Sequence, residues 1–504
     1  DEIYADDFRA LFGNLYIGKH PTPLANNRLV LSFDFSGLNT ENKEVFKESF
    51  RKKVVSQIIE FIHTHESSFP DTNVNDFIAK LEGETDSHSI VDRLLVQMRR
   101  TGKKLFILID EYDHFANDIL AMGGSSYYEE IIRGRGLVRD FYETLKTGAK
   151  TVIDRIFITG ISPVMLDDLT SGYNISSNFT TDPRFNGMMG FTEQEVAGII
   201  KKTGSEKEIS IVQLRFYYNG YLFSSKAEIR IYNPDMILYF IKEWIILGEQ
   251  PENLIDDNVK TDYGRLKRLM LNKRNKASLQ KIIESGECIL SLVSRFSFDQ
   301  MYDPKYFESL LFYMGFLTFY KSFEGISTYV VPNYVIKTLF WDYFREGLEK
   351  EHEIIPDTTE INLAVREMAF RGNLEPFISY IKEHILSALS NRDLIHFNEK
   401  YIKVLLLALI TISPLYRVES EKENARGYID LFLGRDIRFP EVPYQWLWEL
   451  KYLKESERNF LEETKTTGLQ QLSAYIKDKG FSRRGDIKNA LLIFVGKKDC
   501  YVYE

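Results

Sequence analysis

Cysteine is scarce in this sequence of 504 residues, and no metal-binding histidine pattern occurs. The two cysteines, Cys288 and Cys500, lie too far apart in sequence to build a disulfide framework or a Cys-based zinc site. The eight histidines are scattered, and no pair has the spacing of a metal-binding helix. We therefore expect a protein of a reducing compartment, the cytoplasm.

Long apolar runs and an excess of positive charge are also missing. The longest dense apolar run, 404–412, falls far short of the roughly 18 residues of a membrane span, so no membrane partner is expected. Lys and Arg total 64 against 73 Asp and Glu. That balance excludes a uniformly basic nucleic-acid coat protein, although a local basic surface stays open. No signal peptide is visible, and the chain begins with Asp1 rather than Met, so we expect the natural sequence to begin upstream.

The remaining pattern predicts three domains. At roughly 100–200 residues per domain, the length suffices for three, and a hydrophobic content of 44% allows large buried cores. Short apolar strands alternate with helical stretches over residues 1–200, aromatic-rich helices dominate 201–355, and 356–504 again mixes helices and strands. We predict a multidomain α/β protein: a parallel-sheet domain, a helical or winged middle domain and a second α/β domain.

Two carboxylates end an apolar strand in the first domain. The run Leu105–Ile109 is short enough for a buried strand, and Asp110 and Glu111 follow it directly. Ligands of open α/β folds bind at this edge of the sheet. In P-loop NTPases the first acid of such a pair holds Mg²⁺ and the second handles the attacking water. Thr159 ends the next strand, where a sensor residue lies in such sites. The alternative is a strand that simply ends in a polar turn.

The phosphate-binding loop that should accompany these acids is missing. Gly13–His20 (GNLYIGKH) has the glycine and lysine spacing of G-x-x-x-x-G-K-[ST]. His20, however, cannot replace the Mg²⁺-binding hydroxyl, no buried strand precedes the motif, and Pro21 follows where a helix should continue. These residues therefore do not support ATP binding, unless the loop lies upstream of Asp1.

The first part of the chain resembles bacterial proteins that pair an AAA-ATPase-like domain with a C-terminal PD-(D/E)XK nuclease-like domain. The motifs are LYIGKHPTP (15–23), LVLSFDFSG (29–37), FILIDEYDHFAND (106–118) and ITGISPVMLDDLTSGYNIS (158–176). The resemblance implies a P-loop-NTPase-like fold, ATP as the nucleotide and a phosphate loop just before the start of this chain. It also implies that Asp110 and Glu111 are the Mg²⁺- and water-handling acids and that Thr159 is the sensor. Arg184 is a weaker candidate for contacting nucleotide in a neighbouring subunit, which leaves a homo-oligomer open.

Asp430, Glu449 and Lys451 form a second constellation, in the third domain. Alternate side chains of a strand share a face, so Glu449 and Lys451 of Gln445–Leu453 (QWLWELKYL) project side by side, away from the tryptophans. Asp430 is likewise the one carboxylate of the apolar strand Gly427–Leu433. Burying unpaired charge costs free energy. A metal ion held by Asp430 and Glu449 would relieve that cost, and carboxylate oxygens suit Mg²⁺ or Mn²⁺.

This set of residues fits phosphodiester hydrolysis. A metal at the two carboxylates would polarise a phosphate oxygen and lower the pKa of its bound water. Lys451 would orient that water or neutralise charge developing on the phosphate. Gln471 lies on a following helix and joins the set. The alternative is a buried Glu–Lys pair or a strand with one solvated face, because E-x-K by itself is a common motif.

From about residue 395 to 500 the sequence resembles the PD-(D/E)XK nuclease superfamily, which has a restriction-endonuclease-like α/β fold. The motifs are NEKYIKVLLLALI (398–410), ESEKENARGYIDLFL (419–433), WELKYLK (448–454) and LQQLSAYI (469–476). The resemblance implies an acid on the first helix that completes the metal site. Glu399 matches it by position, whereas we interpret Glu421 as a loop charge. Gln471 matches a helix glutamine that faces the site in related nucleases.

The leading hypothesis is a Mg²⁺- or Mn²⁺-dependent nuclease that acts on nucleic acid, with DNA as the expected substrate, under the control of an AAA-ATPase-like module. Two alternatives stay open: a nucleotide-responsive protein that binds DNA without cutting it, and an NTPase alone. Residues 391–504 contain 19 Lys and Arg against 17 Asp and Glu. The nuclease-like part is thus slightly basic in an acidic chain, which is compatible with a polyanionic substrate.

Overall fold

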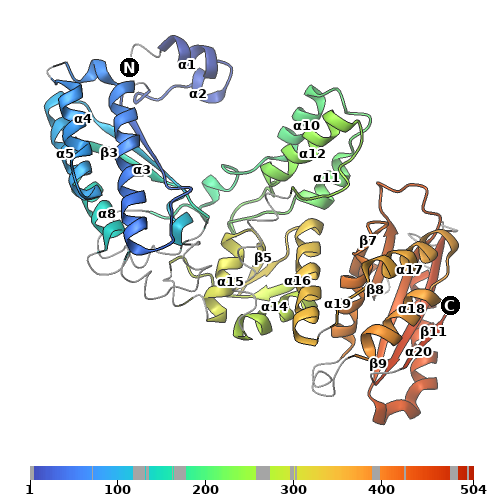
Figure 1. Ribbon diagram of the computed structural model, residues 1–504. Helices are drawn as coiled ribbons and strands as arrows, with labels where there is room; N and C mark the ends of the chain where they lie inside the picture. The colour runs from blue at the N-terminus through green and yellow to red at the C-terminus, as the bar shows by residue number, and fades with distance from the viewer. Residues whose placement is uncertain are drawn as a thin grey trace.

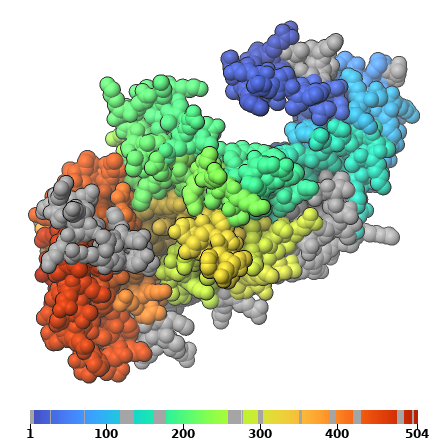
Figure 2. Space-filling view, turned by 180° about the vertical axis from the view of Figure 1, so that it is seen from behind, coloured from blue at the N-terminus to red at the C-terminus, as the bar shows by residue number. Residues whose placement is uncertain are grey.

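The computed structural model describes residues 5–25, 27–70, 72–116, 131, 136–161, 163, 177–256, 273–295, 300, 303–352, 354–388, 398–424, 427–476, 486–496 and 499–504. The molecule is elongated, with an N-terminal α/β segment and a C-terminal sheet at opposite ends and a middle segment between them (Figure 1 and Figure 2). Among the described helices, none combines the length and the apolar character needed to cross a membrane.

The N-terminal segment is a three-stranded parallel sheet with helices packed around it. The strands lie in the order β1 (Leu29–Asp34), β2 (Leu105–Asp110), β3 (Ile153–Ile158). The main helices are α3 (Lys43–Thr64), α5 (Ser87–Thr101) and α8 (Leu137–Gly148). The alternation of strands and helices that the sequence predicts is therefore present. Three helices are additions that the pattern does not predict: α1 (Ala5–Phe12), α2 (Tyr16–Lys19) and α4 (Val74–Glu82).

Side-chain caps explain where α3 and α5 begin. Asn42 accepts a hydrogen bond from the N–H of Val45 at the start of α3, and Asp86 caps α5 in the same way. Helix α5 ends at Gly102, whose φ of 68° is a left-handed conformation that glycine adopts without steric cost. Helix α3 packs aromatic side chains on the sheet, and the rings of Phe50 and Phe35 stack with their centres 4.9 Å apart.

The middle segment combines helices with a small antiparallel sheet. Its helices are α10 (Glu193–Lys202), α11 (Ile211–Tyr218), α12 (Pro234–Leu247), α14 (Lys273–Ser285), α15 (Pro304–Tyr313) and α16 (Tyr334–His352). Its strands lie in the order β4 (Glu287–Ile289), β6 (Ile326–Val330), β5 (Thr318–Phe323). Many of its aromatic side chains are buried, Tyr217, Tyr218 and Phe312 among them, so they belong to the core. The winged interpretation of this segment stays a prediction.

The C-terminal segment is built on a five-stranded mixed sheet. Its strands lie in the order β11 (Asp499–Tyr503), β10 (Ile487–Val495), β9 (Gln445–Leu453), β8 (Gly427–Arg435), β7 (Tyr416–Asn424). Only β9 and β10 pair in parallel among these neighbours. The helices of the segment are α17 (Thr358–Arg371), α18 (Glu375–Tyr380), α19 (Glu399–Ile410) and α20 (Leu461–Ile476).

The two faces of β9 are those that the alternation of its residues predicts. Trp446 and Trp448 are fully buried in the large core that also contains residues of α17, α18 and α19. Leu447 lies instead in a smaller core with Leu472 and Tyr475 of α20. Side chains at odd-numbered positions of β9 therefore face α20, and the proposed site residues of this strand are among them.

The structure corrects the interpretation of residues 419–424. We expected a loop there, with Glu421 as a loop charge, but these residues belong to the edge strand β7. The opposite edge strand, β11, is also one that the pattern does not predict. Charged residues are a common feature of edge strands, because they discourage pairing with other chains. Apolar alternation is confined to Tyr416 and Val418 at the start of β7, so the pattern gave no strand signal over residues 419–424.

Gly468 allows α20 to approach the sheet closely, and its replacement is expected to weaken the fold. A Cβ atom there would lie 2.6 Å from Cδ1 of Leu491 on β10. We expect Gly468→Ala to lower the free energy of unfolding by about 1–3 kcal/mol through overpacking, measured by urea unfolding. Gly198→Ala is the matched control, because a Cβ in that exposed part of α10 meets nothing within 4 Å. An unchanged urea midpoint for Gly468→Ala would contradict the close packing.

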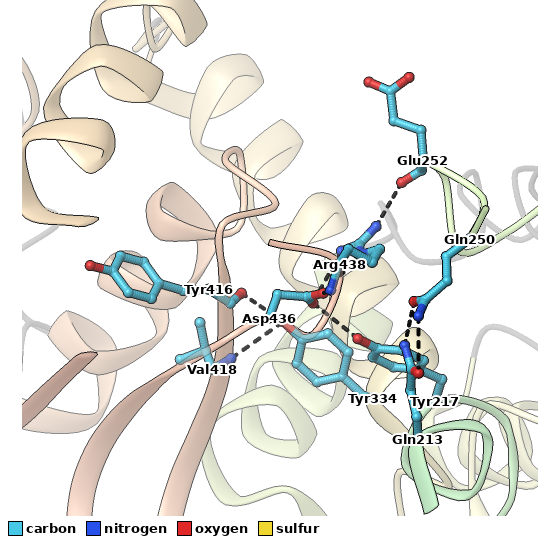
Figure 3. Close-up of polar contacts among 9 residues, drawn as sticks. All are labelled: Gln213, Tyr217, Gln250, Glu252, Tyr334, Tyr416, Val418, Asp436 and Arg438. Carbon is cyan, nitrogen blue, oxygen red and sulfur yellow. Dashed lines mark hydrogen bonds and ion pairs between the residues drawn. The ribbon is translucent and has the colours of Figure 1, made fainter. Parts of the chain in front are cut away.

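A buried polar junction joins the middle segment to the C-terminal sheet (Figure 3). Asp436 follows β8, is 1% exposed and accepts a hydrogen bond from the phenol of Tyr217 on α11 at 3.0 Å. Its other carboxylate oxygen pairs with Nε of Arg438 at 2.9 Å. Arg438 also donates to the carbonyl oxygen of Glu252 at 2.6 Å. The buried charges are therefore paired with each other and with the middle segment.

Tyr334 of α16 is a second anchor of the same junction (Figure 3). Its hydroxyl accepts a hydrogen bond from the N–H of Val418 at 3.3 Å and donates to the carbonyl oxygen of Tyr416 at 3.4 Å. The ring of Phe216 stacks on Tyr334 at 5.0 Å, and the guanidinium of Arg417 lies 4.5 Å from the Phe216 ring centre. The start of β7 and the end of β8 are thus attached to helices of the middle segment.

Candidate active site

Strands β8 and β9 bring Asp430 and Glu449 together. They pair antiparallel with Leu431 opposite Trp448, and continuing this register by one residue sets Asp430 opposite Glu449. Directly opposed residues share a face of the sheet, with Cβ atoms about 4.5–5.5 Å apart. Oδ2 of Asp430 also accepts a hydrogen bond from the N–H of Leu450 at 2.9 Å. That bond orients the Asp430 carboxylate toward β9.

Glu449 is paired through only one of its carboxylate oxygens. Its side chain is 3% exposed, and Oε1 accepts a hydrogen bond from Nζ of Lys451 at 2.7 Å. Oε2 is buried and has no hydrogen-bond partner among the described residues. A buried polar atom without a partner is costly, and such an atom calls for an explanation. Oε2 of Glu449 is therefore the atom of this site that a further ligand would satisfy.

Helix α20 covers this face and adds two side chains. Oε1 of Gln471 is also buried and has no partner in the described part of the chain. Tyr475, one turn further along α20, is 7% exposed. Burial first, and then the negative charges of Glu449 and Asp430, raise the pKa of its phenol. Tyr475 therefore lies close to the paired carboxylates, and Gln471 lies one turn before it on the same helix.

Glu399 approaches the same charges from α19. Asn398 caps this helix by accepting a hydrogen bond from the N–H of Tyr401 at 2.9 Å, which makes Glu399 its first residue. Burial raises the pKa of Glu399, the positive charge of Lys451 lowers it, and the negative charge of Asp430 raises it. The structure thus gathers Glu399, Asp430, Glu449 and Lys451 in one region, and Gln471 lies on the helix that packs on this sheet.

The carboxyl edge of the N-terminal sheet brings Asp110 and Thr159 together. The N–H of Thr159 continues the β2–β3 pairing by donating to the carbonyl oxygen of Ile109 at 2.8 Å. Its hydroxyl donates to Oδ1 of Asp110 at 2.5 Å. Asp34, the last residue of β1, stands opposite Asp110 in the strand register. Asp34 is a second carboxylate at this edge.

Glu111 and Arg184 have local partners instead. Glu111 has a φ of 51°, in the left-handed region that residues other than glycine rarely adopt. One of its carboxylate oxygens lies 2.7 Å from Nδ1 of His114. Arg184, whose side chain is 74% exposed, pairs with Asp182 at 2.6 Å. The structure therefore groups Asp110 with Thr159 and leaves Glu111 directed toward His114.

Two family profiles match separate parts of the chain. Residues 1–170 match an AAA-ATPase-like family described as a predicted AAA-ATPase. Residues 397–504 match the PD-(D/E)XK nuclease superfamily. The chain joins an AAA-ATPase-like segment to a PD-(D/E)XK nuclease segment. The pairing of an AAA-ATPase-like part with a C-terminal PD-(D/E)XK part, which the sequence motifs indicate, is confirmed, and the bounds of the three domains stay a prediction.

Among curated proteins, the chain is similar to an uncharacterized protein in the vnfD 5′ region of Azotobacter chroococcum mcd 1. The two are 28% identical over 164 residues, which cover 31% of this chain and 29% of the relative. The match therefore spans less than a third of the relative's length. No solved structure matches.

The PD-(D/E)XK segment offers two opposed carboxylates to a divalent cation. Asp430 and Glu449 share a face, and the unpaired Oε2 of Glu449 fits a hard cation that binds oxygen. In the part of the chain that the structure describes, no group of three or more His, Cys, Asp or Glu side chains is arranged to hold a metal ion. A cation here would keep several waters, as Mg²⁺ commonly does when one or two carboxylates bind it.

Metal binding to the PD-(D/E)XK segment is expected to strengthen with rising pH. Burial first, and then the charge of Asp430, raise the pKa of Glu449 to about 7, against the opposing effect of Lys451. Below that pH a proton competes with the cation for the carboxylate. We expect the affinity for Mn²⁺ to rise by about tenfold per pH unit up to pH 6.5 and to level off near pH 8, measured by titration calorimetry. Glu449→Gln should remove this dependence, and a constant wild-type affinity from pH 5 to 8 would contradict it.

The same pKa shift predicts how the stability of the metal-free protein depends on pH. The folded-state pKa of Glu449, about 7, lies above its ordinary value of 4.5. The contribution of this group to stability is therefore fully present below pH 4.5 and is lost as the pH rises through 7. The free energy of unfolding should fall less between pH 5.5 and pH 8 for Glu449→Gln than for the wild type. Urea unfolding of both proteins at the two pH values measures this difference. An equal loss in both proteins would contradict the shift.

Sequence reasoning missed Tyr475 and Asp34. Tyr475 follows Gln471 by four residues, which places both side chains on one face of a helix. Asp34 ends an apolar strand in the same way as Asp110 does. A signal was therefore present in both cases: a polar residue on the chosen helix face, and an acid at the end of a predicted strand.

Proposed function

We propose that this protein is a metal-dependent nuclease that hydrolyses the phosphodiester bonds of DNA. The observation that carries the proposal is the arrangement of Asp430, Glu449 and Lys451 on one face of the sheet beneath α20, with Oε2 of Glu449 unpaired. The match of residues 397–504 to a nuclease superfamily supports the same class of reaction.

Asp430 and Glu449 would hold Mg²⁺ or Mn²⁺, which when bound supplies Lewis acidity and an activated water. Burial lowers the pKa of Lys451, but the hydrogen bond to Glu449 and the neighbouring carboxylates raise it, and the net shift is upward. Lys451 therefore stays protonated at neutral pH. It neutralises charge developing on the phosphate oxygens rather than acting as a base. Oε1 of Gln471 can accept a hydrogen bond from the attacking water.

Control by nucleotide is the second part of the proposal. Asp110 would hold Mg²⁺, Glu111 would orient water and Thr159 would sense the nucleotide, which we expect to be ATP. The hydrogen bond between Thr159 and Asp110 supports a linked pair at the sheet edge. The middle segment packs against the nuclease segment, so it offers a route from one site to the other.

Cleavage assays with several substrates test this proposal. The protein should be incubated with linear DNA, circular DNA and RNA, in Mg²⁺, in Mn²⁺ and in EDTA. We expect cutting of DNA that stops in EDTA and in the Lys451→Ala protein. Metal-dependent cutting that survives both Lys451→Ala and Glu449→Ala would overturn the site assignment. Cutting confined to RNA would overturn the substrate.

Binding of DNA without cleavage is the second candidate function. The observation that favours it is the ion pair between Glu449 and Lys451, which occupies one carboxylate oxygen and the only ammonium of the proposed catalytic set. A protein that retards DNA on a native gel but cuts nothing in any metal would favour this candidate. An NTPase acting alone would hydrolyse ATP and do neither.

A further inference from the structure

A niche opens beside Lys451, on the α20 side of the nuclease segment. It is an open depression of about 370 Å³, lined by Lys451, Phe460, Glu463, Thr464 and Thr467. This volume lies within the range of about 300–1,000 Å³ that is usual for small-molecule sites. The proposed nuclease function does not use any of these residues except Lys451.

The turn between β9 and α20 places an aromatic ring on this niche. A short 3₁₀ helix, η7 (Glu455–Phe460), reverses the chain, so Phe460 returns to the level of Lys451. Arg458 holds η7 against β11 by pairing with Asp499 at 2.5 Å and donating to the hydroxyl of Tyr501 at 3.0 Å. Phe460 is nevertheless 49% exposed. A large apolar ring in a braced turn thus remains half open to solvent.

The residue spacing aligns Phe460, the last residue of η7, with one face of α20. Phe460, Thr464, Thr467, Gln471 and Tyr475 follow one another at spacings of four, three, four and four residues. Side chains at such spacings line up along one side of a helix. Tyr475, at one end of the row, lies near Glu449 and Asp430, whereas Phe460 lies at the other end. Lys451 lines the niche and donates a hydrogen bond to Oε1 of Glu449 at 2.7 Å, so the niche borders the point where the phosphate would react.

The chemistry of the niche suits a nucleobase better than a phosphate. The ring of Phe460 offers a stacking surface, which every base can use because every base has a π-face. The exposed carboxylate of Glu463 would repel a phosphate but can accept a hydrogen bond from the amino group of a base. The hydroxyl of Thr467 donates to the carbonyl oxygen of Glu463 at 3.1 Å and keeps its own acceptor capacity.

We propose that this niche binds one unpaired nucleobase of the strand being cut, stacked on Phe460 and next to the reacting phosphate. A base within a duplex is already stacked on both sides and cannot offer its face to a protein ring. The protein therefore selects single-stranded DNA or frayed ends over an intact duplex. This inference rests on the proposed nuclease function and adds a substrate class to it.

Binding measurements in EDTA test the niche without any cleavage. Fluorescence anisotropy should compare a labelled single strand of mixed sequence with its blunt duplex. Phe460→Ala and Phe460→Leu are expected to weaken single-strand binding by about 5- to 150-fold, the range found for loss of one base–aromatic stack. Phe460→Tyr keeps the ring and should bind like the wild type. Duplex binding should be weaker than single-strand binding and should not change in any variant.

Phe323→Ala is the matched control, because this exposed phenylalanine of β5 is far along the chain from the niche and is 73% exposed. Its single-strand affinity should equal that of the wild type. The inference is overturned if Phe460→Leu binds the single strand as well as the wild type does, if Phe323→Ala weakens binding equally, or if the wild type prefers the duplex. Binding that depends on Phe460 in a protein that cuts nothing would contradict the nuclease function alone.

Discussion

Glu449→Gln is expected to abolish metal-dependent DNA cleavage, with the rate constant falling by about 100- to 10,000-fold. Glutamine has the shape of glutamate but no negative charge, so the site would lose one of its two opposed anionic ligands. The loss corresponds to the several kcal/mol that a metal contributes to stabilising transition-state charge. Single-turnover cleavage of linear DNA in Mg²⁺ and in Mn²⁺ will measure it.

The folded state should survive this change, which separates a chemical defect from a structural one. Glu449 is buried with one unpaired oxygen, so removing its charge also removes a desolvation cost. We expect the urea midpoint of Glu449→Gln to equal or exceed that of the wild type at pH 8. Glu441→Gln is the control, an exposed glutamate between β8 and β9 that should leave cleavage unchanged. Wild-type cleavage by Glu449→Gln would remove this carboxylate from the mechanism.

Asp436→Ala is expected to lower the free energy of unfolding by about 3–5 kcal/mol, since it leaves a buried charge without its partner. Asp436 is 1% exposed, and the side chain of Arg438 is 10% exposed. The substitution removes the partner of Arg438 and the acceptor of the Tyr217 phenol in the junction of Figure 3. Urea unfolding of the whole chain, followed by circular dichroism, will measure the loss.

The chain contains a matched control for this prediction. Asp182 and Arg184 have the same spacing and also form an ion pair, but the Arg184 side chain is 74% exposed. Asp182→Ala should therefore destabilise the protein far less than Asp436→Ala does, because an exposed ion pair contributes little. Tyr217→Phe, which removes a single hydroxyl, should cost about 1.5–3 kcal/mol because it removes one hydrogen bond to a buried charged group. Oδ2 of Asp436 still accepts the hydrogen bond from Arg438 at 3.2 Å. Equal losses for Asp182→Ala and Asp436→Ala would show that burial does not set the strength of the junction.

Local sequence patterns were sufficient where one element could be judged by itself. The alternation in Gln445–Leu453 predicts both faces of β9, and the structure puts the tryptophans in one core and Leu447 in the other. The apolar run Leu105–Ile109 predicts a buried strand ending in acid, which is β2. These predictions hold because side chains of a strand alternate whatever the strand packs against. They do not test the roles of the site residues, which stay proposals.

Patterns were insufficient where an element has little apolar signal or depends on a distant partner. Strand β7 is charged, and β11 comprises only five residues at the end of the described chain. The hydrogen bond between Tyr217 and Asp436 joins residues 219 positions apart, and the sequence around either residue does not indicate its partner. The same holds for Tyr475, whose electrostatic link to Glu449 and Asp430 arises only when α20 lies on the sheet.

The sequence by itself determined the composition of this protein's sites: acids at the ends of apolar strands, and a Glu-x-Lys pair on the polar positions of β9. Only the tertiary structure decided which oxygen of Glu449 is paired and which is not, and that Asp110 meets Thr159. It also decided that Phe460 returns to Lys451. The reason is physical: backbone geometry sets the direction of a side chain locally, whereas burial and pairing depend on atoms supplied by other parts of the chain.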